Sequence, residues 1–269
     1  RCMSEIDPEA LRRFGDHVDF GKTADDYATH RAGFPPEFFE ALEARGFLLK
    51  GHSAVDIGTG TGTIARGLAR RGLRVTAIDP AKDLLAEAAR LDLETGVKVT
   101  YRPGAAEDTG LQDLSADLVT AGQCWHWFDR PRAAQEAMRL LVPGGRILIA
   151  HFDWVPLTGS LVAATEALIL RHNPEWAGAR GSGLNPARLG DLSDAGFGCI
   201  ETASFDVLQS YSHIAWRGRI RASAGIAASL PADAVAEFDA ELAALLECFF
   251  HDDPTEVPHR VWWVTALKA

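Results

Sequence analysis

A glycine-rich turn between an apolar strand and a helix constrains the fold of this chain more than any other feature. It reads Val-Asp-Ile-Gly-Thr-Gly-Thr-Gly-Thr over residues 55–63, so that glycines stand at positions 58, 60 and 62. Glycines at alternate positions remove the Cβ atoms that would hold a ligand away from the backbone. In doubly wound α/β sheets, the first turn from strand to helix is where nucleotide-like ligands bind. The turn therefore predicts an α/β sheet that binds a ligand at the end of its first strand.

The residues around this turn alternate between strand-like and helix-like segments. Short apolar runs predict strands at 54–57, 74–78, 98–101, 117–120 and 145–152, and the stretches between them predict helices at 63–71, 81–91 and 131–141. Strands that alternate with helices of about ten residues are typical of βαβ units, whose parallel sheet is covered on both faces. We expect an α/β fold with a doubly wound, mostly parallel sheet.

The pattern changes after residue 154, and this change suggests the domain organisation. Helices are predicted at 161–171, 186–195, 211–223 and 232–250, and strands at 200–206 and 260–267. We expect a helical lead-in or lid over residues 1–50 and a ligand-binding core over 51–154. Residues 155–269 are expected to add a helical cap and two strands that complete the sheet.

The acids near the glycine turn indicate which ligand it binds. A dinucleotide fingerprint would place its third glycine at position 63, where this chain has Thr63. Asp56 is a poor neighbour for a pyrophosphate; it suits a ligand with positive charge, or it holds the turn in place. Asp79 ends the next strand, 21 residues after Gly58, and can accept both hydroxyls of a ribose. These residues favour a ribose-containing cofactor without a pyrophosphate and disfavour an NAD-linked or nucleotide-sugar enzyme.

Taken together, the motifs resemble the class I S-adenosylmethionine-dependent methyltransferases, in the small-molecule subgroup similar to trans-aconitate and ubiquinone-pathway methyltransferases. The resemblance extends over about residues 20–153, and its carriers are 56–62, 79–80, 104–107, 124–128 and the Leu-Val-Pro-Gly-Gly turn at 141–145. It implies a seven-stranded Rossmann-like sheet whose antiparallel last strand is 260–267. A tight turn and a surface acid are the structural alternatives for the glycines and for Asp79 taken singly.

The resemblance also implies the cofactor and its contacts. The cofactor is S-adenosylmethionine, the product is S-adenosylhomocysteine, and no metal is involved. The three glycines line the methionine end, Asp79 holds the ribose, and the backbone around Ala106 and Glu107 contacts the adenine. Many relatives have an aspartate where this chain has Ala105, so the contact to the adenine amino group is lost here or Glu107 replaces it. The expected cofactor-binding residues are Tyr27, Arg31, Asp56, Gly58, Thr59, Gly60, Gly62, Asp79, Pro80, Ala106, Glu107 and Gln123.

The lead-in over residues 20–31 is similar to the opening of that family. Tyr27 and Arg31 are four residues apart, so on a helix they share one face. A guanidinium group matches the carboxylate of the cofactor's methionine part. The alternative is a surface helix that only packs on the sheet.

The acceptor side is expected after the fourth strand, at residues 119–128. His126, with an ordinary pKa near ~6.5, is a candidate general base, and a structural histidine between two tryptophans is the alternative. Gln123 stands at the strand end and can reach the cofactor or the acceptor. The expected substrate pocket consists of Trp125, Trp127, His151 and Trp154. Arg217 and Arg221 share a helix face that can receive an acidic acceptor, although a solvated face is the favoured interpretation.

Composition narrows the class of partner. The formal net charge is −10 and basic residues form no block longer than a pair, which disfavours a nucleic-acid substrate. Apolar runs are strand-sized, so no membrane span is expected, and no apolar secretory segment opens the chain. Four widely separated cysteines without a C-x-x-C pair suit a reducing compartment, the cytoplasm. No group of histidines and acids has metal-ligand spacing.

These expectations combine into one functional hypothesis. The chain is predicted to transfer a methyl group by in-line displacement to an oxygen, nitrogen or carbon nucleophile of a small molecule. It is expected to act as a monomer or a homodimer. The alternative is a non-catalytic protein that binds the same cofactor and serves as a regulatory partner.

Overall fold

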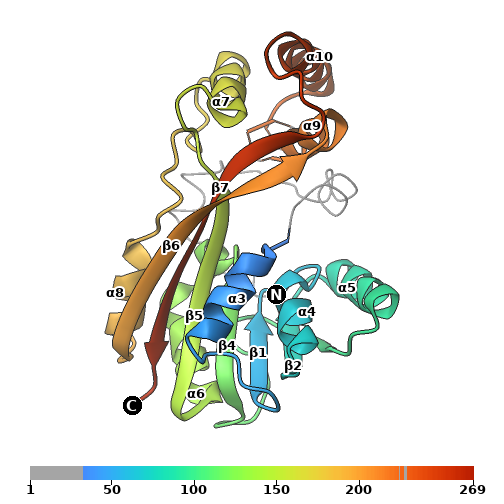
Figure 1. The fold of residues 1–269 in the computed structure, drawn as a ribbon. Coiled ribbons are helices and arrows are strands. Elements are labelled where there is room, and N and C mark those ends of the chain that lie inside the picture. Colours follow the sequence, from blue (N-terminus) through green and yellow to red (C-terminus); the bar gives the residue numbers. More distant parts are fainter. Residues whose placement is uncertain (1–32, 224, 227–228) are drawn as a thin grey trace.

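The computed structural model describes residues 33–223, 225–226 and 229–269 of the chain, and its centre is a seven-stranded sheet in the order β3-β2-β1-β4-β5-β7-β6 (Figure 1). Strands β1 to β5 run parallel, and β7 is antiparallel to both of its neighbours, β5 and β6. This confirms the expected mostly parallel, doubly wound sheet with an antiparallel strand near one edge. The strands are β1 (Ser53–Ile57), β2 (Arg74–Asp79), β3 (Thr100–Pro103), β4 (Ala116–Gly122), β5 (Leu141–Trp154), β6 (Gly198–Tyr211) and β7 (Thr255–Leu267).

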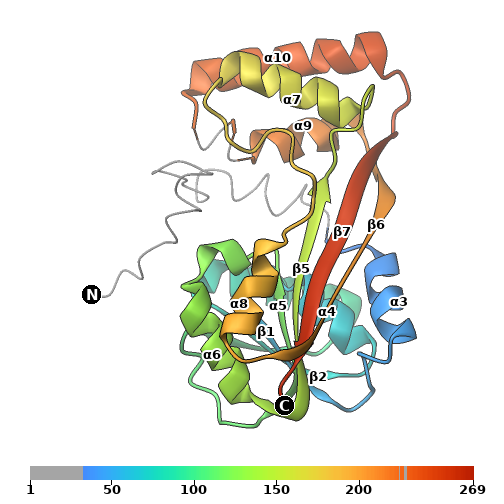
Figure 2. The ribbon, with the colours of Figure 1, turned by 90° about the vertical axis from the view of Figure 1, so that its left-hand side faces the viewer.

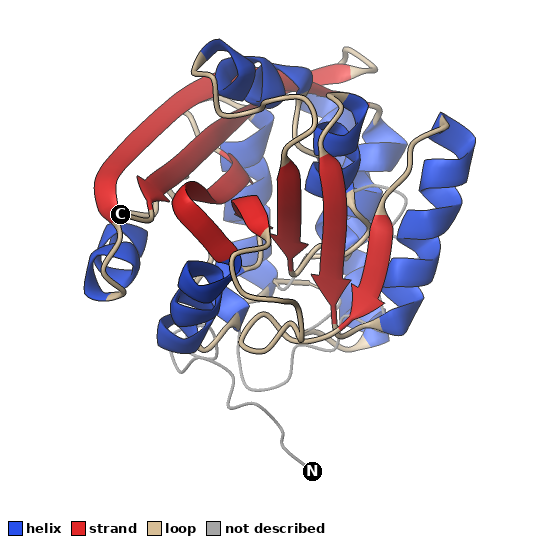
Figure 3. Ribbon diagram, turned by 90° about the horizontal axis from the view of Figure 1, so that it is seen from below, coloured by secondary structure: helices blue, strands red, loops and turns tan. Residues whose placement is uncertain are grey.

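Helices cover both faces of the sheet (Figure 3). One face packs against α3 (Pro36–Ala44) and α4 (Thr63–Arg70), whose buried side chains include Phe38 and Leu68. The other face packs against α6 (Arg130–Leu140) and α8 (Ala187–Asp194). Helix α5 (Lys82–Thr95) lies along β2 and β3, at the edge of the sheet. Apolar residues on both faces of the central strands explain why those strands are continuous apolar runs in the sequence.

Strands β5, β6 and β7 are longer than the sequence predicts. They exceed the expected ranges 145–152, 200–206 and 260–267. Along β6, exposed residues such as Glu201 and Ser210 alternate with partly buried ones and interrupt the apolar pattern. An edge strand with one exposed face reads as polar over half of its positions. The extra residues carry the strands beyond the core toward a second group of helices (Figure 2).

That second group is the cap, made of α7 (Leu161–His172), α9 (His213–Arg221) and α10 (Ala232–Phe249). It has its own apolar core, in which Trp216, Phe238 and Leu242 are almost fully buried. Helix α8 does not join it, and lies beside α6 on the sheet. The three long strands join cap and core, so residues along them connect the carboxyl edge of the sheet to the cap (Figure 2). In the described part of the chain, no helix is both long and apolar enough to cross a membrane.

Candidate active site at the carboxyl edge of the sheet

The turn after β1 brings its backbone close to the segment that follows β4. Gly58, Gly60 and Gly62 have φ angles of 64°, 55° and 77°, in the left-handed region that favours glycine. A Cβ on Gly58 would lie 2.7 Å from the Phe128 ring and 2.8 Å from Cys124 Sγ, so protein atoms already fill that side. A Cβ on Gly60 would meet no described heavy atom within 4 Å. The turn is therefore packed beneath Gly58 and open at Gly60.

Asp56 lies beneath this turn and ties it to β4. Its side chain accepts hydrogen bonds from the hydroxyls of Thr59 and Thr120, both at 2.6 Å, and the residue is 2% exposed. Burial raises the pKa of Asp56 to about 6, although the two hydroxyl donors act in the opposite direction. Of the two roles expected for Asp56, these contacts correspond to holding the turn.

Asp79 joins the end of β2 to the same turn. One carboxylate oxygen accepts the amide hydrogen of Gly60 at 2.9 Å, and the other accepts that of Ala81 at 2.9 Å. An ionised carboxylate has about four acceptor positions, so each oxygen can accept a further bond. The side chain is thus fixed beside the open part of the turn and retains capacity for a ligand hydroxyl. Pro80, which follows it, is exposed.

A buried ion pair that no sequence motif predicts supports the turn from the side of α4. The Arg66 guanidinium donates to Asp92 Oδ1 at 2.7 Å, to the Thr61 carbonyl at 3.0 Å and to the Ala88 carbonyl. The Tyr101 hydroxyl donates to the other oxygen of Asp92 at 2.9 Å, and burial together with this carboxylate raises the pKa of Tyr101. Arg66 and Asp92 are 26 residues apart and belong to no common motif, so their ion pair cannot be predicted from one sequence.

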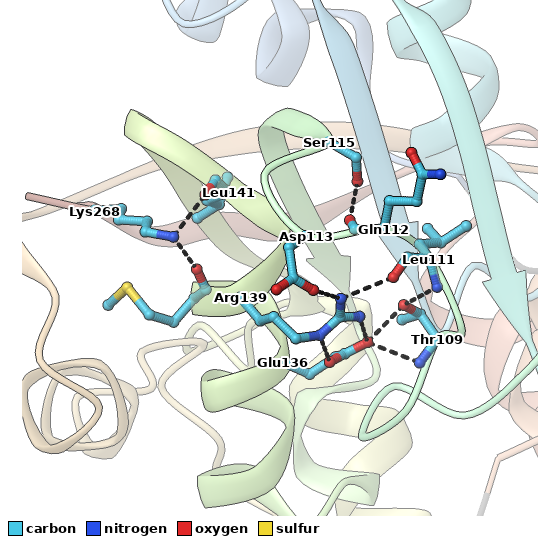
Figure 4. Close-up of polar contacts among 10 residues, drawn as sticks. Thr109, Leu111, Gln112, Asp113, Ser115, Glu136, Arg139, Leu141 and Lys268 are labelled. Carbon is cyan, nitrogen blue, oxygen red and sulfur yellow. Dashed lines mark hydrogen bonds and ion pairs between the residues drawn. The ribbon is translucent and has the colours of Figure 1, made fainter.

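The segment after β3, which carries Ala106 and Glu107, is anchored to α6 (Figure 4). Glu136 accepts from the amide and the hydroxyl of Thr109 at 2.9 and 2.6 Å, and Arg139 donates to both Glu136 and the Leu111 carbonyl. Hydrogen bonding to Arg139 and Thr109 outweighs burial and lowers the pKa of Glu136. Its ionised form therefore fixes the loop next to the expected adenine site.

Glu107 and Ala106 occupy different positions in this loop. Ala106 is 4% exposed and belongs to the apolar core. The Glu107 carboxylate turns toward α6, where it accepts the Asp129 amide hydrogen at 2.8 Å. One Glu107 oxygen is thus already bonded to the protein, which weakens the idea that it replaces the aspartate that many relatives have at position 105.

Gln123 connects the carboxyl ends of β4 and β5. Its φ angle is 60°. Its backbone N–H donates to the Ala150 carbonyl at 2.9 Å, and its side-chain nitrogen donates to the Phe152 carbonyl. The same nitrogen lies 3.4 Å from Asp153 Oδ1. The side-chain nitrogen of Gln123 therefore points to β5, and of the side-chain amide only the oxygen remains to meet a ligand.

The aromatic residues after β4 separate into two groups. Trp125 is fully buried and donates to Asp191 of α8 at 2.9 Å, so its indole packs β4 against α8 and does not line an open pocket. His126 and Trp127 are half-buried, with ring centroids 4.7 Å apart. His151 on β5 lies 6.2 Å from the His126 ring. The structure thus brings His126, Trp127 and His151 together and sets Trp125 apart.

Trp154 lies at the end of β5, next to the cap. Its indole nitrogen donates to Glu166 of α7 at 3.0 Å, and its ring centroid lies 5.7 Å from that of Trp216. The Arg219 guanidinium lies 5.1 Å from the Trp154 ring centroid. Trp154 is therefore the point where the end of β5 meets the cap.

The cap arginines at 217 and 221 have a structural contact. Both donate to Asp239 of α10, Arg217 Nε at 3.0 Å and Arg221 at 2.9 Å. This pairing ties α9 to α10 and explains the spacing without an acidic acceptor. Tyr27 and Arg31 lie outside the described residues, as does the whole lead-in at 20–31.

The possible metal ligands and the cavities of the described residues also bear on the site. Within the described residues, no group of three or more histidines, cysteines or acids is arranged to hold a metal ion. Two cavities of about 700 and 800 Å³ lie elsewhere, at residues 249–256 and beside the amino ends of β1 and β2. Neither includes the glycine turn or Asp79, so the site rests on the contacts at the carboxyl edge.

Comparison with known proteins finds methyltransferases among the proteins to which this chain is similar. Residues 55–149 match the family described as "Methyltransferase domain". The uncharacterized methyltransferase Rv3342 of Mycobacterium tuberculosis (strain ATCC 25618 / H37Rv) is 30% identical over 202 residues, which cover 68% of this chain and 78% of the relative. The ubiquinone biosynthesis O-methyltransferase of Xanthomonas euvesicatoria pv. vesicatoria (strain 85-10) is 31% identical over 178 residues, with 65% and 72% coverage. The fold matches that of Haemonchus contortus phosphoethanolamine N-methyltransferase 2 in complex with S-adenosyl-L-methionine at a TM-score of 0.53 and 21% identity, covering 97% of this chain and 59% of that chain.

Proposed function

The chain belongs to the class I S-adenosylmethionine-dependent methyltransferases, and on that premise we propose that it methylates an oxygen, nitrogen or carbon nucleophile of a small molecule by in-line displacement. One observation carries the proposal. The Asp79 carboxylate is held at 2.9 Å from the Gly60 amide, beside the part of the turn where a Cβ would meet no described atom. This arrangement combines a ribose acceptor with a backbone that a ligand can approach closely.

The residues at the edge fit S-adenosylmethionine. An open glycine backbone admits the cofactor where a side chain would exclude it, and the spare acceptor capacity of Asp79 suits the two ribose hydroxyls. When bound, the cofactor supplies an electrophilic methyl group on a sulfonium centre. Asp56 holds the turn through Thr59, and Glu136 holds the loop that carries Ala106 and Glu107.

The other expected cofactor contacts remain part of the proposal. Gln123 would contribute its side-chain oxygen, because its nitrogen is bonded to β5. Gly58 and Gly62 would shape the turn around the methionine end, and Pro80 would start the segment after the ribose-binding acid. Tyr27 and Arg31 would cover the cofactor and bind its carboxylate.

We assign the acceptor side to four residues that lie between the end of β4 and the cap: His126, Trp127, His151 and Trp154. His126 would remove a proton from a hydroxyl or amine acceptor, and the half-buried rings around it would exclude water. The leaving thioether needs no proton, so holding the nucleophile in line supplies most of the rate enhancement. A small-molecule acceptor fits the net charge of −10 better than a nucleic acid does.

The test is an acceptor assay. The purified chain is incubated with S-adenosylmethionine and with cell extract divided by size into molecules below and above about 10 kDa, and formation of S-adenosylhomocysteine is measured. We expect turnover with the small-molecule fraction only. Turnover with the macromolecular fraction alone would overturn the acceptor class. Cofactor binding without turnover in either fraction would favour the non-catalytic, regulatory alternative.

A further inference from the structure

A second polar group lies along the stretch of β5, β6 and β7 between the core and the cap, among residues with no role in the account above. His259 on β7 stands opposite Trp154 on β5 and Val207 on β6 in the strand register. Tyr211 ends β6. Both side chains are almost fully buried, at 1% and 5% exposure. A histidine and a tyrosine in the interior ordinarily need hydrogen-bond partners.

The hydrogen-bonding state of His259 follows from its one bond to the protein. Its Nδ1 lies 3.0 Å from the Val257 carbonyl oxygen, which can only accept, so Nδ1 carries the hydrogen. Burial lowers the pKa of His259 to about 4, so the ring is neutral at pH 7. Nε2 then presents a lone pair, and it has no hydrogen-bond partner among the described residues.

The Tyr211 hydroxyl is in the same situation. It is buried, and it too has no hydrogen-bond partner in the described part of the chain. Its ring is nearly parallel to that of His259, with centroids 5.8 Å apart and an interplanar angle of 23°. An unsatisfied acceptor and an unsatisfied hydroxyl thus occur on neighbouring stacked rings. Buried polar atoms left without partners are costly, and a bound molecule, either an ordered water or a ligand hydroxyl, can satisfy both.

The surroundings connect this pair to the site of methyl transfer. The Phe152 ring centroid lies 4.9 Å from that of His259, and the Phe152 carbonyl accepts the side-chain hydrogen bond of Gln123. On the cap side, the Tyr211 ring lies 5.3 Å from that of Trp216, which in turn packs on Trp154. In the strand register His259 lies opposite Trp154, four residues along β5 from Ala150, which pairs with the last residue of β4. The pair therefore lies between the carboxyl end of β4 and the cap, next to aromatic side chains.

The chemistry of the pair selects the kind of molecule it can hold. A neutral imidazole lone pair accepts a hydrogen bond and repels a carboxylate, while a phenolic hydroxyl donates one. A hydroxyl group is the ligand counterpart that both donates and accepts. Two charged groups, Arg219 and Asp153, lie near enough to act on His259, and their effects on its pKa oppose each other. With these opposite charges and the aromatic rings around the pair, a neutral ligand group fits better than a charged one, because burying an unpaired charge is strongly unfavourable.

We propose that Tyr211 and His259 form the recognition site for the acceptor, binding a hydroxyl group of a neutral molecule with an apolar body. This inference rests on the proposed methyl transfer and deepens it, because it names the chemical class of the acceptor. His259 Nε2 accepts the ligand's hydroxyl hydrogen and the Tyr211 hydroxyl donates to a ligand oxygen. Both are positioning residues that hold the acceptor while the reaction occurs nearer to β4.

The test uses phenol as the probe and anisole, its methyl ether, as the matched compound without a donor. Binding is measured on protein saturated with S-adenosylhomocysteine, together with the ¹⁵N resonance of His259 Nε2 in histidine-labelled protein. We expect phenol to bind more tightly than anisole and to shift the Nε2 resonance, which anisole leaves in place. Tyr211→Phe and His259→Phe should each weaken phenol binding roughly fivefold, the loss expected for one hydrogen bond.

Three controls separate the outcomes. His172→Phe changes a cap histidine that pairs with Glu241, and it should leave phenol binding unchanged. Tyr211→Phe should unfold at the same or a higher denaturant concentration than the parent, because it removes only an unsatisfied hydroxyl. Equal binding of phenol and anisole, or a destabilised Tyr211→Phe with unchanged phenol binding, would overturn the inference. If the parent does not bind S-adenosylhomocysteine, the proposed function fails instead, and that result is read before phenol is added.

Discussion

The Asp79 carboxylate accepts the Gly60 amide hydrogen at 2.9 Å and so joins the end of β2 to the turn after β1. The ends of the neighbouring parallel strands β1 and β2 thereby hold an acid beside a backbone position at which a Cβ would meet no described atom. In doubly wound sheets, nucleotide-like ligands bind at this edge, and the proposed roles of the surrounding residues depend on this contact.

Gly60 provides the first prediction. Gly60→Ala should abolish or strongly weaken S-adenosylhomocysteine binding, because the new methyl group would project into space that is open at present. Gly144→Ala is the matched control, since Gly144 also has a positive φ, of 75°, and also has no described atom near its Cβ position. Each substitution should cost about 1 kcal/mol of stability from backbone strain. Calorimetric titration of both variants compares them, and equal binding by the two would contradict the role of the open turn.

The buried ion pair beneath the turn provides the second. Arg66→Ala leaves the Asp92 carboxylate buried without its partner, so the free energy of unfolding should fall by about 3 to 5 kcal/mol. Arg70→Ala, on an exposed position of the same helix, should change it by less than about 0.5 kcal/mol. Urea unfolding measures both. A loss of similar size in the two variants would mean that the pair does not support the turn.

The third prediction concerns pH. Asp56 has a pKa of about 6 in the folded chain and an ordinary value of 3.8. The folded state therefore holds a proton more tightly than the unfolded state does. The stability it contributes is fully present below about pH 4 and is lost as the pH rises through 6, by roughly 3 kcal/mol in total.

Asp56→Asn removes this titration. The free energy of unfolding of the variant minus that of the parent should therefore rise between pH 4 and pH 6 and then level off. Taking the difference cancels groups common to both proteins, including His259, whose lowered pKa makes stability fall as the pH drops from about 6.5 to about 4. A difference that stays constant with pH would show that Asp56 titrates normally.

His126 provides the fourth prediction, on catalysis. If its ring removes a proton from the acceptor, His126→Ala should lower turnover by roughly 100-fold or more while cofactor affinity stays the same. The rate with the small-molecule fraction and the calorimetric affinity for S-adenosylhomocysteine together test this. Equal losses in rate and in affinity would assign His126 a structural role.

The parallel core of the fold was predictable from sequence, and the reason is local. Each central strand is a continuous apolar run and each helix has its own period, so β1 to β5 and their crossovers follow from short windows. The extent of β6 was not, since alternating burial hides an edge strand whose exposed positions are polar. The position of α8 beside α6 also depends on packing between distant segments.

Some residues of the candidate site were also predictable from sequence, and others were not. Gly60 and Asp79 were predictable because each follows or ends a strand that is visible in the sequence. The two strands are neighbours in the sheet, so their carboxyl ends lie close together. Arg66 with Asp92, and Tyr211 with His259, are pairs that only the folded chain brings together. Trp125 was expected in the pocket because it adjoins His126 in sequence, but its side chain points into the core and bonds to Asp191.

The most direct test of the central claim is a calorimetric titration of the chain with S-adenosylhomocysteine and, separately, with NAD, repeated with Asp79→Ala and with Asp83→Ala. Asp83 is an exposed acid in the first turn of α5 and serves as the matched control. We predict micromolar binding of S-adenosylhomocysteine and none of NAD, with affinity reduced at least tenfold by Asp79→Ala and unchanged by Asp83→Ala. Binding of NAD, binding of neither compound, or equal affinities in the two variants would contradict the account.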